Sequence, residues 1–237
     1  MWLALELSTL AGSVALFRPD GTTVAEHSLP PALRRTGALL PQIAALYRTL
    51  GRTPRQTAGV AISVGPGSFT GLRTACTIAR MLRSAVGCSV VGIPSFEVLA
   101  VAWGRARPNA GEGPIAALRD ARRGQVYAAT LRMSDGAWHS SEVRCVAAAD
   151  WLLANDGLAA VISDDPLEKQ ATGWGSAGER FVRVAPSATD LARAAGARIA
   201  RREFLAPNEI VPKYVRPPEC EEVYEAKRAA AIAKRGP

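Results

Sequence analysis

The feature that most constrains the fold is a pattern of strands and helices that occurs twice along the chain. Each block opens with consecutive short strands and continues with alternating helices and strands. Such alternation is typical of α/β folds, in which helices cover the faces of a sheet. The 237 residues are enough for one large domain or two smaller ones. We therefore expect two α/β lobes, one over residues 1–104 and a second, reduced one over residues 105–237 that ends in a charged tail.

The first block predicts three antiparallel strands followed by alternating helices and strands. Pro19-Asp20-Gly21 supplies one of the turns, since Pro presets φ and Gly tolerates positive φ. The expected elements are strands at Trp2–Leu7, Ser13–Phe17 and Thr22–Ser28, a helix at Thr36–Leu50, a strand at Ala58–Val64, a helix after Gly71 that ends near Val86, a strand at Ser89–Ile93 and a helix at Ser95–Trp103.

The second block follows a stretch rich in Gly, Pro and Arg, Arg105–Gly113, which predicts a linker. The expected elements are strands at Ile115–Leu118, Gln125–Arg132 and Ala137–Val143, a helix at Ala147–Ala154, a strand at Ala159–Ser163, a loop at Asp164–Gly178, a strand at Phe181–Val184, a helix at Thr189–Phe204 and an extended segment at Ile210–Val215. The tail from Glu219 is expected to fray or to form a loose helix. No residue-level repeat is visible, so the duplication rests on the pattern alone.

Two helices of the first block carry more apolar surface than one packed face requires. In the helix at Thr36–Leu50 the apolar arc is about 160° wide, whereas a surface helix needs about 100°. The helix after Gly71 leaves only a narrow polar face. Each helix is therefore covered on more than one side, either within its own lobe or by a partner.

The glycine-rich turn Gly65–Gly71 joins a buried strand to a helix, which is the geometry of an anion site. It is neither a Walker A loop nor a GxGxxG motif, because no Gly-Lys-Ser/Thr follows and the third glycine comes one residue late. The candidate binding residues are Gly65, Gly67, Ser68 and Thr70. A structural turn that uses glycine for positive φ or close backbone approach is at least as well supported.

Four polar residues, Glu6, Ser8, Thr9 and Ser13, bracket the first hairpin. An acidic strand end followed by hydroxyl groups can hold a nucleotide-bound metal ion through oxygen contacts. The alternative is a polar strand end that satisfies its own backbone. Both interpretations remain open from the sequence.

Residues for metal-dependent or nucleophilic catalysis are scarce. The two histidines, His27 and His139, are far apart in sequence and have no metal-ligand spacing. No GxSxG motif occurs, so no Ser/His/Asp triad is expected. The four cysteines form no CxxC pair and predict idle thiols in a reducing compartment.

Net charge and hydropathy limit the kinds of partner that the chain can have. The net charge is +8 and the pI is about 9.9, with 29 basic residues that do not form a dense run. Attraction to a nucleic acid is one interpretation, and an arginine-rich bias over the whole surface is the favoured one. No apolar run approaches the roughly 20 residues of a membrane span, and the N-terminus has no signal-peptide features. We therefore expect a cytoplasmic protein without membrane contact.

These segments together resemble the TsaB (YeaZ) family, a subunit of the bacterial machinery that makes threonylcarbamoyladenosine at position 37 of tRNA. The most specific signature is Gly-Pro-Gly-Ser-Phe-Thr-Gly-Leu-Arg, which is unbroken from Gly65 to Arg73. The other matching segments are Leu5–Thr9, Ser13–Leu16, Leu39–Pro41, Gly92–Leu99, Asp120–Tyr127 and Pro212–Arg216. The likeness is strong over about the first hundred residues and patchy afterwards.

The resemblance implies an actin-like ATPase/sugar-kinase fold of two lobes. It implies a non-catalytic scaffold that forms a homodimer alone, pairs with the catalytic paralogue TsaD and works with the ATPase TsaE. No cofactor or metal is expected in the chain itself, ATP or ADP with magnesium being expected only at the border of the complex, and tRNA contact is expected to be indirect or weak. The family pairs through its first two long helices. The corresponding interface residues here are Leu39, Leu40, Ile43, Leu46, Tyr47, Leu50, Arg73, Ile78, Met81 and Leu82.

Two departures from the family pattern bear on the function. The usual aspartate at the end of the first strand is Glu6, and the usual His-Ser before Leu-Leu-Pro is Thr36-Gly37. Two alternative functions remain open: a phosphotransferase or ATPase of the same fold that uses Glu6, Ser8 and the loop from Gly65 to Thr70, and a glycoprotease-like peptidase.

Overall fold

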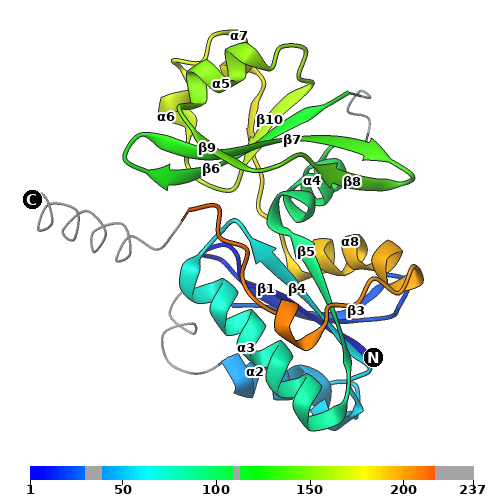
Figure 1. The fold of residues 1–237 in the computed structure, drawn as a ribbon. Coiled ribbons are helices and arrows are strands. Elements are labelled where there is room, and N and C mark those ends of the chain that lie inside the picture. Colours follow the sequence, from blue (N-terminus) through cyan, green and yellow to red (C-terminus); the bar gives the residue numbers. More distant parts are fainter. Residues whose placement is uncertain (30–38, 109–112, 217–237) are drawn as a thin grey trace, which may run out of the picture.

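The computed structural model describes residues 1–29, 39–108 and 113–216. Two β-sheets lie one above the other, each with helices on its outer side and with two helices between them (Figure 1). Lobe I is the lobe built on the sheet that contains the N-terminus, and lobe II is built on the other sheet. The fold is therefore the two-lobed α/β arrangement that the sequence predicts.

The sheet of lobe I has five strands in the order β3-β2-β1-β4-β5. Its central strand pairs antiparallel with β2 and parallel with β4, so that Leu3 lies opposite Leu16 on one side and Val60 on the other. The strands are β1 (Trp2–Glu6), β2 (Ser13–Phe17), β3 (Thr23–Ser28), β4 (Gly59–Gly65) and β5 (Ser89–Pro94). The helices are α2 (Leu39–Arg48), η1 (Pro54–Gln56), α3 (Phe69–Val86) and α4 (Ser95–Ala106).

The main path of the sheet of lobe II has the order β8-β7-β6-β10-β11, with β9 paired to β7. Strand for strand this repeats the order of lobe I, so β6 corresponds to β1 and β10 to β4. The strands are β6 (Ile115–Arg122), β7 (Gln125–Ser134), β8 (Ala137–Ser140), β9 (Arg144–Val146), β10 (Ala160–Ser163) and β11 (Phe181–Arg183). The helices are α5 (Ala148–Ala154), α6 (Glu168–Ala171), α7 (Ser176–Glu179), α8 (Ala188–Ala200) and η2 (Pro207–Glu209).

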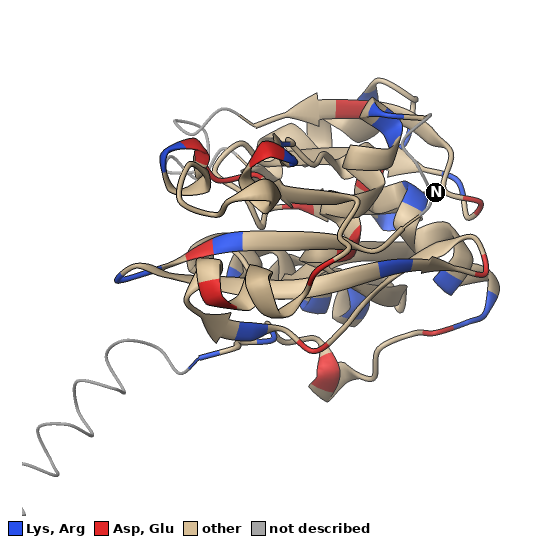
Figure 2. Cartoon of the chain, turned by 90° about the horizontal axis from the view of Figure 1, so that it is seen from above, with Lys and Arg blue, Asp and Glu red and all other residues tan. Residues whose placement is uncertain are grey.

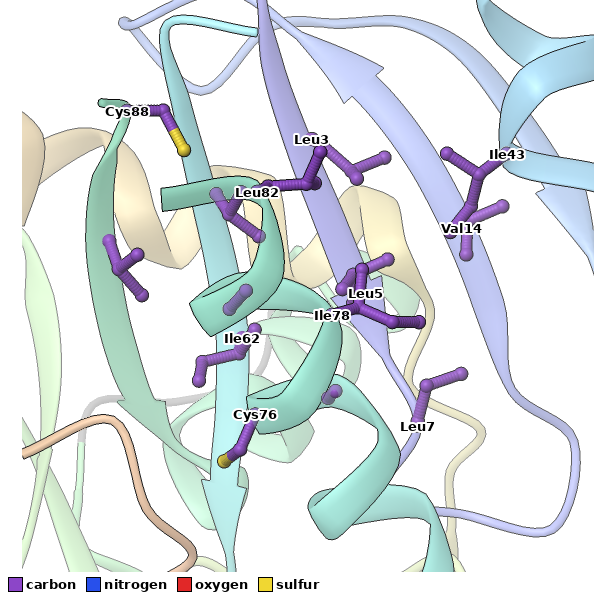
Figure 3. Close-up of a cluster of buried hydrophobic side chains, with 14 of the residues drawn as sticks. Leu3, Leu5, Leu7, Val14, Ile43, Ile62, Cys76, Ile78, Leu82 and Cys88 are labelled. Atoms are coloured by element: carbon purple, nitrogen blue, oxygen red, sulfur yellow. The ribbon is translucent and has the colours of Figure 1, made fainter. Parts of the chain in front are cut away.

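The outer face of the lobe I sheet is covered by α2 and α3. Because side chains alternate across a strand, Leu3 and Leu5 of β1 point to this face. They pack with Ile43 of α2 and with Ile78 and Leu82 of α3, and the same cluster is drawn in Figure 3. The two helices thus share one core with their own sheet.

The inner faces of the two sheets are covered by exchanged helices. Ala4 of β1 packs with Leu191 and Ala195 of α8, although α8 follows the last strand of lobe II. Reciprocally, Phe96 and Leu99 of α4, which follows the last strand of lobe I, pack on the lobe II sheet. A boundary after residue 104 therefore does not describe the packing, because α8 returns to lobe I.

Several expected elements differ in extent or kind. The expected loop Asp164–Gly178 contains α6 and α7, the strand expected at Ala137–Val143 ends at Ser140, and β9 is an additional strand. Helix α4 runs to Ala106, into the expected linker, and α8 ends at Ala200 rather than at Phe204. The expectations for Thr36-Gly37 and for the tail from Glu219 lie outside the described residues.

Candidate functional site

The candidate site lies where β1 of lobe I and β6 of lobe II end. Glu6 ends β1, and Arg119 lies near the end of the equivalent strand β6. Both side chains belong to buried residues, with Glu6 fully enclosed. The central strands of the two lobes thus place one acidic and one basic side chain at the boundary between the lobes.

Glu6 is hydrogen-bonded entirely by lobe I. Its Oε1 accepts from the Ser8 backbone N–H at 2.9 Å and from the Ser8 hydroxyl, and its Oε2 accepts from the Ser63 hydroxyl at the end of β4. Burial raises the pKa of Glu6 above its ordinary value, whereas these hydrogen bonds and the charge of Arg119 act in the opposite direction. Both carboxylate oxygens are therefore already occupied by protein donors.

Arg119 links the two lobes. Its Nε and Nη2 donate to Oδ1 of Asp164 at 2.9 and 2.6 Å, within lobe II. Its Nη1 donates across the boundary to the carbonyl oxygens of Pro66 and Ser8. An arginine carries five N–H donors in a planar fork, so one side chain can bond to a carboxylate and to two carbonyl groups at once.

The glycine-rich loop closes around this arginine. A Cβ atom on Gly67 would lie 2.6 Å from Arg119 Nη1 and 2.6 Å from the Ser8 carbonyl oxygen. Gly65 has φ of +120°, and a Cβ atom there would lie 2.8 Å from the Lys213 carbonyl oxygen. Close approach and positive φ therefore account for both glycines. This outcome favours the structural-turn interpretation of the loop.

The remaining candidate residues of the loop and hairpin are also used structurally. Ser68 caps α3, where its hydroxyl accepts from Gly71 N–H at 3.3 Å. Ser13 Oγ accepts from the Ala188 N–H at 2.6 Å and donates to Glu26 at 3.1 Å, which ties the first hairpin to α8. Thr9 is buried and Thr70 is exposed. Of the eight predicted residues, Thr9 lines a neighbouring cavity, whereas the side chains of Glu6, Ser13 and Ser68 are hydrogen-bonded within the protein.

A nucleotide-bound metal, which the fold class implies, does not fit these residues. The Glu6 carboxylate has no free oxygen lone pair directed at solvent, and Arg119 occupies the space beside Gly67. A neighbouring cavity of about 380 Å³ is lined by Thr9, Asp164, Asp165 and Arg183 among others. Burial and the adjacent Asp164 raise the pKa of Asp165, and Asp164 itself already accepts two hydrogen bonds from Arg119. No catalytic step through a nucleotide follows from this geometry.

The sequence reasoning missed Ser63, Arg119 and Asp164. A signal for Arg119 was present, because a charged residue directly after the apolar run Ile115–Leu118 is unusual at the end of a buried strand. The equivalence of β6 with β1 would have placed it opposite Glu6. That equivalence became visible only with the strand order of the two sheets.

The predicted interface residues fall into three groups by burial. Five of them, namely Ile43, Leu46, Tyr47, Ile78 and Leu82, are buried in the core of lobe I. These side chains attach α2 and α3 to their own sheet, so they leave little surface for a partner. Leu39 and Leu50 are partly buried against the same core.

Three of the predicted interface residues remain exposed. Leu40 on α2 is 49% exposed and Met81 on α3 is 47% exposed. Arg73 stacks over the Phe69 ring at 3.9 Å and donates to the Tyr214 hydroxyl at 2.8 Å. The exposed part of the predicted pairing surface therefore consists of these three residues on α2 and α3.

Other features place few constraints on chemistry. Among the described residues no group of three or more His, Cys, Asp or Glu side chains is arranged to hold a metal ion. Cys76, Cys88 and Cys145 are free, and Cys220 lies outside the described part of the chain. Within the described ranges, no helix has the length and apolarity of a membrane span. Basic and acidic residues are interspersed on both lobes (Figure 2).

Two lobes of equal strand order with exchanged inner helices define a protein of the actin-like ATPase/sugar-kinase fold class. A family model described as "TsaD: tRNA N6-adenosine threonylcarbamoyltransferase" matches residues 34–202. Because this match covers more than half of the chain, the chain belongs to that family of TsaD-like proteins, which includes TsaB and YeaZ.

Individual relatives carry the TsaB and YeaZ names. The chain is 36% identical over 146 residues to the tRNA threonylcarbamoyladenosine biosynthesis protein TsaB of Escherichia coli, with 61% of each chain covered. It is 29% identical over 151 residues to TsaB of Bacillus subtilis, with 63% of each covered. A solved structure of YeaZ from Pseudomonas aeruginosa superposes with a TM-score of 0.71 at 27% identity, covering 90% of this chain and 98% of that one.

The sequence matches cover only part of the length of the curated relatives. The aligned stretch spans about three fifths of the length of the curated relatives, 61% and 63%. The fold likeness extends over almost the whole YeaZ chain. The resemblance to the TsaB (YeaZ) family that the sequence indicates is thereby confirmed.

Proposed function

We propose that this protein is a non-catalytic subunit in the synthesis of threonylcarbamoyladenosine on tRNA, and that it supports a catalytic TsaD-type partner. The relatives named TsaB are described as threonylcarbamoyladenosine biosynthesis proteins. The single observation that carries the non-catalytic role is Arg119, which fills the space beside the glycine-rich loop and bonds to Pro66 and Ser8. A subunit whose own cleft is filled by its own side chain contributes binding surface rather than chemistry.

The partner surface that we propose is centred on the exposed residues of α2 and α3. Leu40 and Met81 lie on neighbouring helices of the outer layer of lobe I (Figure 1). Exposed apolar side chains on rigid helices are suited to helix–helix pairing, because little conformational entropy is lost on association. The same surface would serve for self-pairing in isolation and for pairing with TsaD.

The test uses size-exclusion chromatography with light scattering on the protein alone and mixed with the TsaD-type protein of the same organism. We expect a dimer alone and a mixed complex in the mixture. A Leu40→Glu/Met81→Glu double variant should be monomeric and should not join the complex, since two buried unpaired carboxylates oppose association. Leu153→Glu, at a 79% exposed position on α5, is the matched control and should behave like the parent.

Reconstitution completes the test. Formation of threonylcarbamoyladenosine on tRNA by the mixture should fall with the double variant and not with the control. A parent protein that stays monomeric and ignores the TsaD-type protein would contradict the proposal. TsaE is included as a further component, and its addition measures whether a third protein joins the same complex.

The two rival activities have less support. An ATPase that uses Glu6, Ser8 and the Gly65–Thr70 loop requires the Arg119 contacts to open, and calorimetric binding of Mg-ATP followed by turnover would establish it. One solved relative from Pseudomonas aeruginosa is titled as similar to "peptidase YEAZ". In this chain His27 and His139 lie on strands of different sheets, β3 and β8, so they do not form one catalytic centre.

A further inference from the structure

A second cavity is lined by residues of α4, of α8 and of the turn between β7 and β8. Figure 1 shows where these elements lie, with both helices between the two sheets. The volume of the cavity is about 400 Å³, within the range of small-molecule sites. It shares no lining residue with the Gly65–Thr70 loop, with the Asp164–Asp165 cavity or with the proposed pairing surface. It is therefore a separate feature of the molecule.

The floor of this cavity is rigid because two ion pairs hold the helices together. Arg105 of α4 donates through Nε and Nη2 to Asp190 of α8 at 2.8 and 3.1 Å. Glu97 of α4 accepts from Arg198 of α8 at 2.8 Å and from the Ser140 N–H of β8 at 3.4 Å. Glu97 and Asp190 are both buried. Fixed walls of this kind reduce the entropy lost when a ligand binds.

One part of the lining is apolar. Val101, Ala194 and Ala197 contribute aliphatic surface from the two helices, and Trp138 contributes an indole ring from β8. Trp138 is held in place by an edge-on contact with Trp103, the ring centroids being 5.9 Å apart. A planar or aliphatic group can stack on such a surface.

The other part of the lining is cationic. Arg105, Arg193, Arg198 and Arg201 all line the cavity. Arg201 pairs with Glu203 at 2.5 Å, so the carboxylates that accompany these arginines are Glu97, Asp190 and Glu203. Four guanidinium groups thus face three carboxylates. Within the described part of the chain Arg193 has no ion pair or side-chain hydrogen bond, and it is exposed at the rim.

We propose that this cavity binds a small organic anion in which a phosphate or carboxylate group is attached to an aromatic body. The anionic group would bind to Arg193 and to the unused N–H donors of Arg105 and Arg201. Guanidinium groups are well matched to both kinds of anion, because their planar fork donates two parallel hydrogen bonds. The aromatic body would stack against Trp138 and the alanines of α8.

The test is calorimetric titration of the full chain with AMP and with indole-3-acetate, the two probes that separate phosphate from carboxylate. Adenosine and indole serve as their neutral counterparts. We expect at least one anion to bind with a Kd below about 1 mM and its neutral counterpart to bind at least about tenfold more weakly. Affinity for the anion should fall as sodium chloride is added, because salt screens the arginines.

Three variants locate the binding. Arg193→Glu should weaken the anion by about tenfold or more, since it replaces the free cation by a repelling charge. Arg55→Glu, the same charge change at an exposed residue of η1, should leave affinity unchanged. Ala197→Leu should weaken binding by filling the cavity without any change of charge. Thermal melts establish that each variant is folded.

Three results would overturn the proposal: no binding of either anion, equal binding of the neutral counterparts, or equal losses in Arg193→Glu and Arg55→Glu. Complex formation with the TsaD-type protein is measured separately. Because the cavity and the α2/α3 surface share no residues, loss of one property leaves the other testable.

Discussion

The two lobes have the same strand order but differ in the helices that cover their outer faces. Lobe I uses the 10-residue α2 and the 18-residue α3, whereas lobe II uses the 7-residue α5 and the 4-residue α6 and α7. In lobe II, Trp151 and Trp174 pack over the sheet together with Leu152 and Leu167. Large side chains on short segments thus replace the apolar stripe of a long helix.

This difference indicates which part of a duplicated fold is free to change. Helix α4 contributes Val98 to the core of lobe I and Phe96 and Leu99 to the core of lobe II, so altering it disturbs two cores at once. The outer helices pack mainly on their own sheet and can shorten if other side chains fill the space. The partner surface that we propose lies on the longer outer helices of lobe I.

The largest effect is expected when a large side chain that covers the outer face of the lobe II sheet is removed. Trp174 is buried and packs edge-on against Phe181 at 5.8 Å. Trp174→Ala should lower the free energy of unfolding by about 4 kcal/mol, because no neighbouring helix can fill the space. Urea denaturation measures the loss, and hydrogen exchange should be faster in β10 than in β4. Leu153→Ala, at an exposed position, is the control; equal losses in the two variants would contradict the interpretation.

The next largest effect concerns the contact between the lobes. Arg119→Met should lower the free energy of unfolding by about 3 kcal/mol, because Asp164 and two carbonyl groups lose their donors. The exposed Arg132→Met on β7 is the matched control. Denaturant titration followed by tryptophan fluorescence gives both values. If the loss in Arg119→Met does not exceed that of the control, Arg119 does not hold the lobes together.

The pH dependence of stability tests the role of Glu6 at the end of β1. Burial raises the pKa of Glu6 above its ordinary value of 4.5, so the folded state holds a proton that the unfolded state releases. The parent therefore loses stability as the pH rises from about 4.5 through the folded-state pKa of Glu6. Below that range, the stabilising contribution of Glu6 is fully present. Glu6→Gln removes this dependence.

The Glu6→Gln experiment is urea denaturation of parent and variant between pH 4 and pH 8. The stability of the variant relative to the parent should increase as the pH rises. Glu179→Gln, at an exposed residue of α7, is the control. A difference between Glu6→Gln and the parent that does not change with pH would show that Glu6 does not titrate in this way.

The smallest expected effect concerns helix capping in lobe II. Helix α8 starts with a capping box in which Ser187 accepts from Asp190, whereas α5 follows Ala147, which provides no side-chain cap. Ala147→Ser should raise the free energy of unfolding by about 0.5–1 kcal/mol. Thermal denaturation by circular dichroism measures it, with Ala149→Ser, inside α5, expected to give no gain. A gain in both would mean that capping is not the cause.

Many residues of the candidate site could be identified from the sequence, but their roles could not. Glu6, Ser8 and Gly67 were found because polar and glycine residues at strand ends are conspicuous. Whether they bind a ligand or one another depends on what fills the adjacent space. That space is filled by Arg119, which lies more than a hundred residues further along the chain than Ser8, a pairing that no local pattern specifies.

Local sequence signals are sufficient to predict many of the helices and strands. The bounds of β2 agree with the expected ones to the residue, and Gly87 ends α3 with φ of +70° because only glycine adopts that conformation without strain. The α/β alternation and the reduced second lobe followed from periodicity.

The sheet that each inner helix covers could not be predicted, because it depends on contacts between segments that are distant in sequence. The apolar face of α8 fits either sheet as far as its pattern is concerned. In the structure Leu191 and Ala195 pack on Ala4 of lobe I, and ion pairs with Arg105 and Glu97 join α8 to α4. The same holds for α2 and α3, whose wide apolar faces did not reveal which side chains enter the core. Periodicity gives the width of an apolar face, whereas contacts between distant segments decide what covers it.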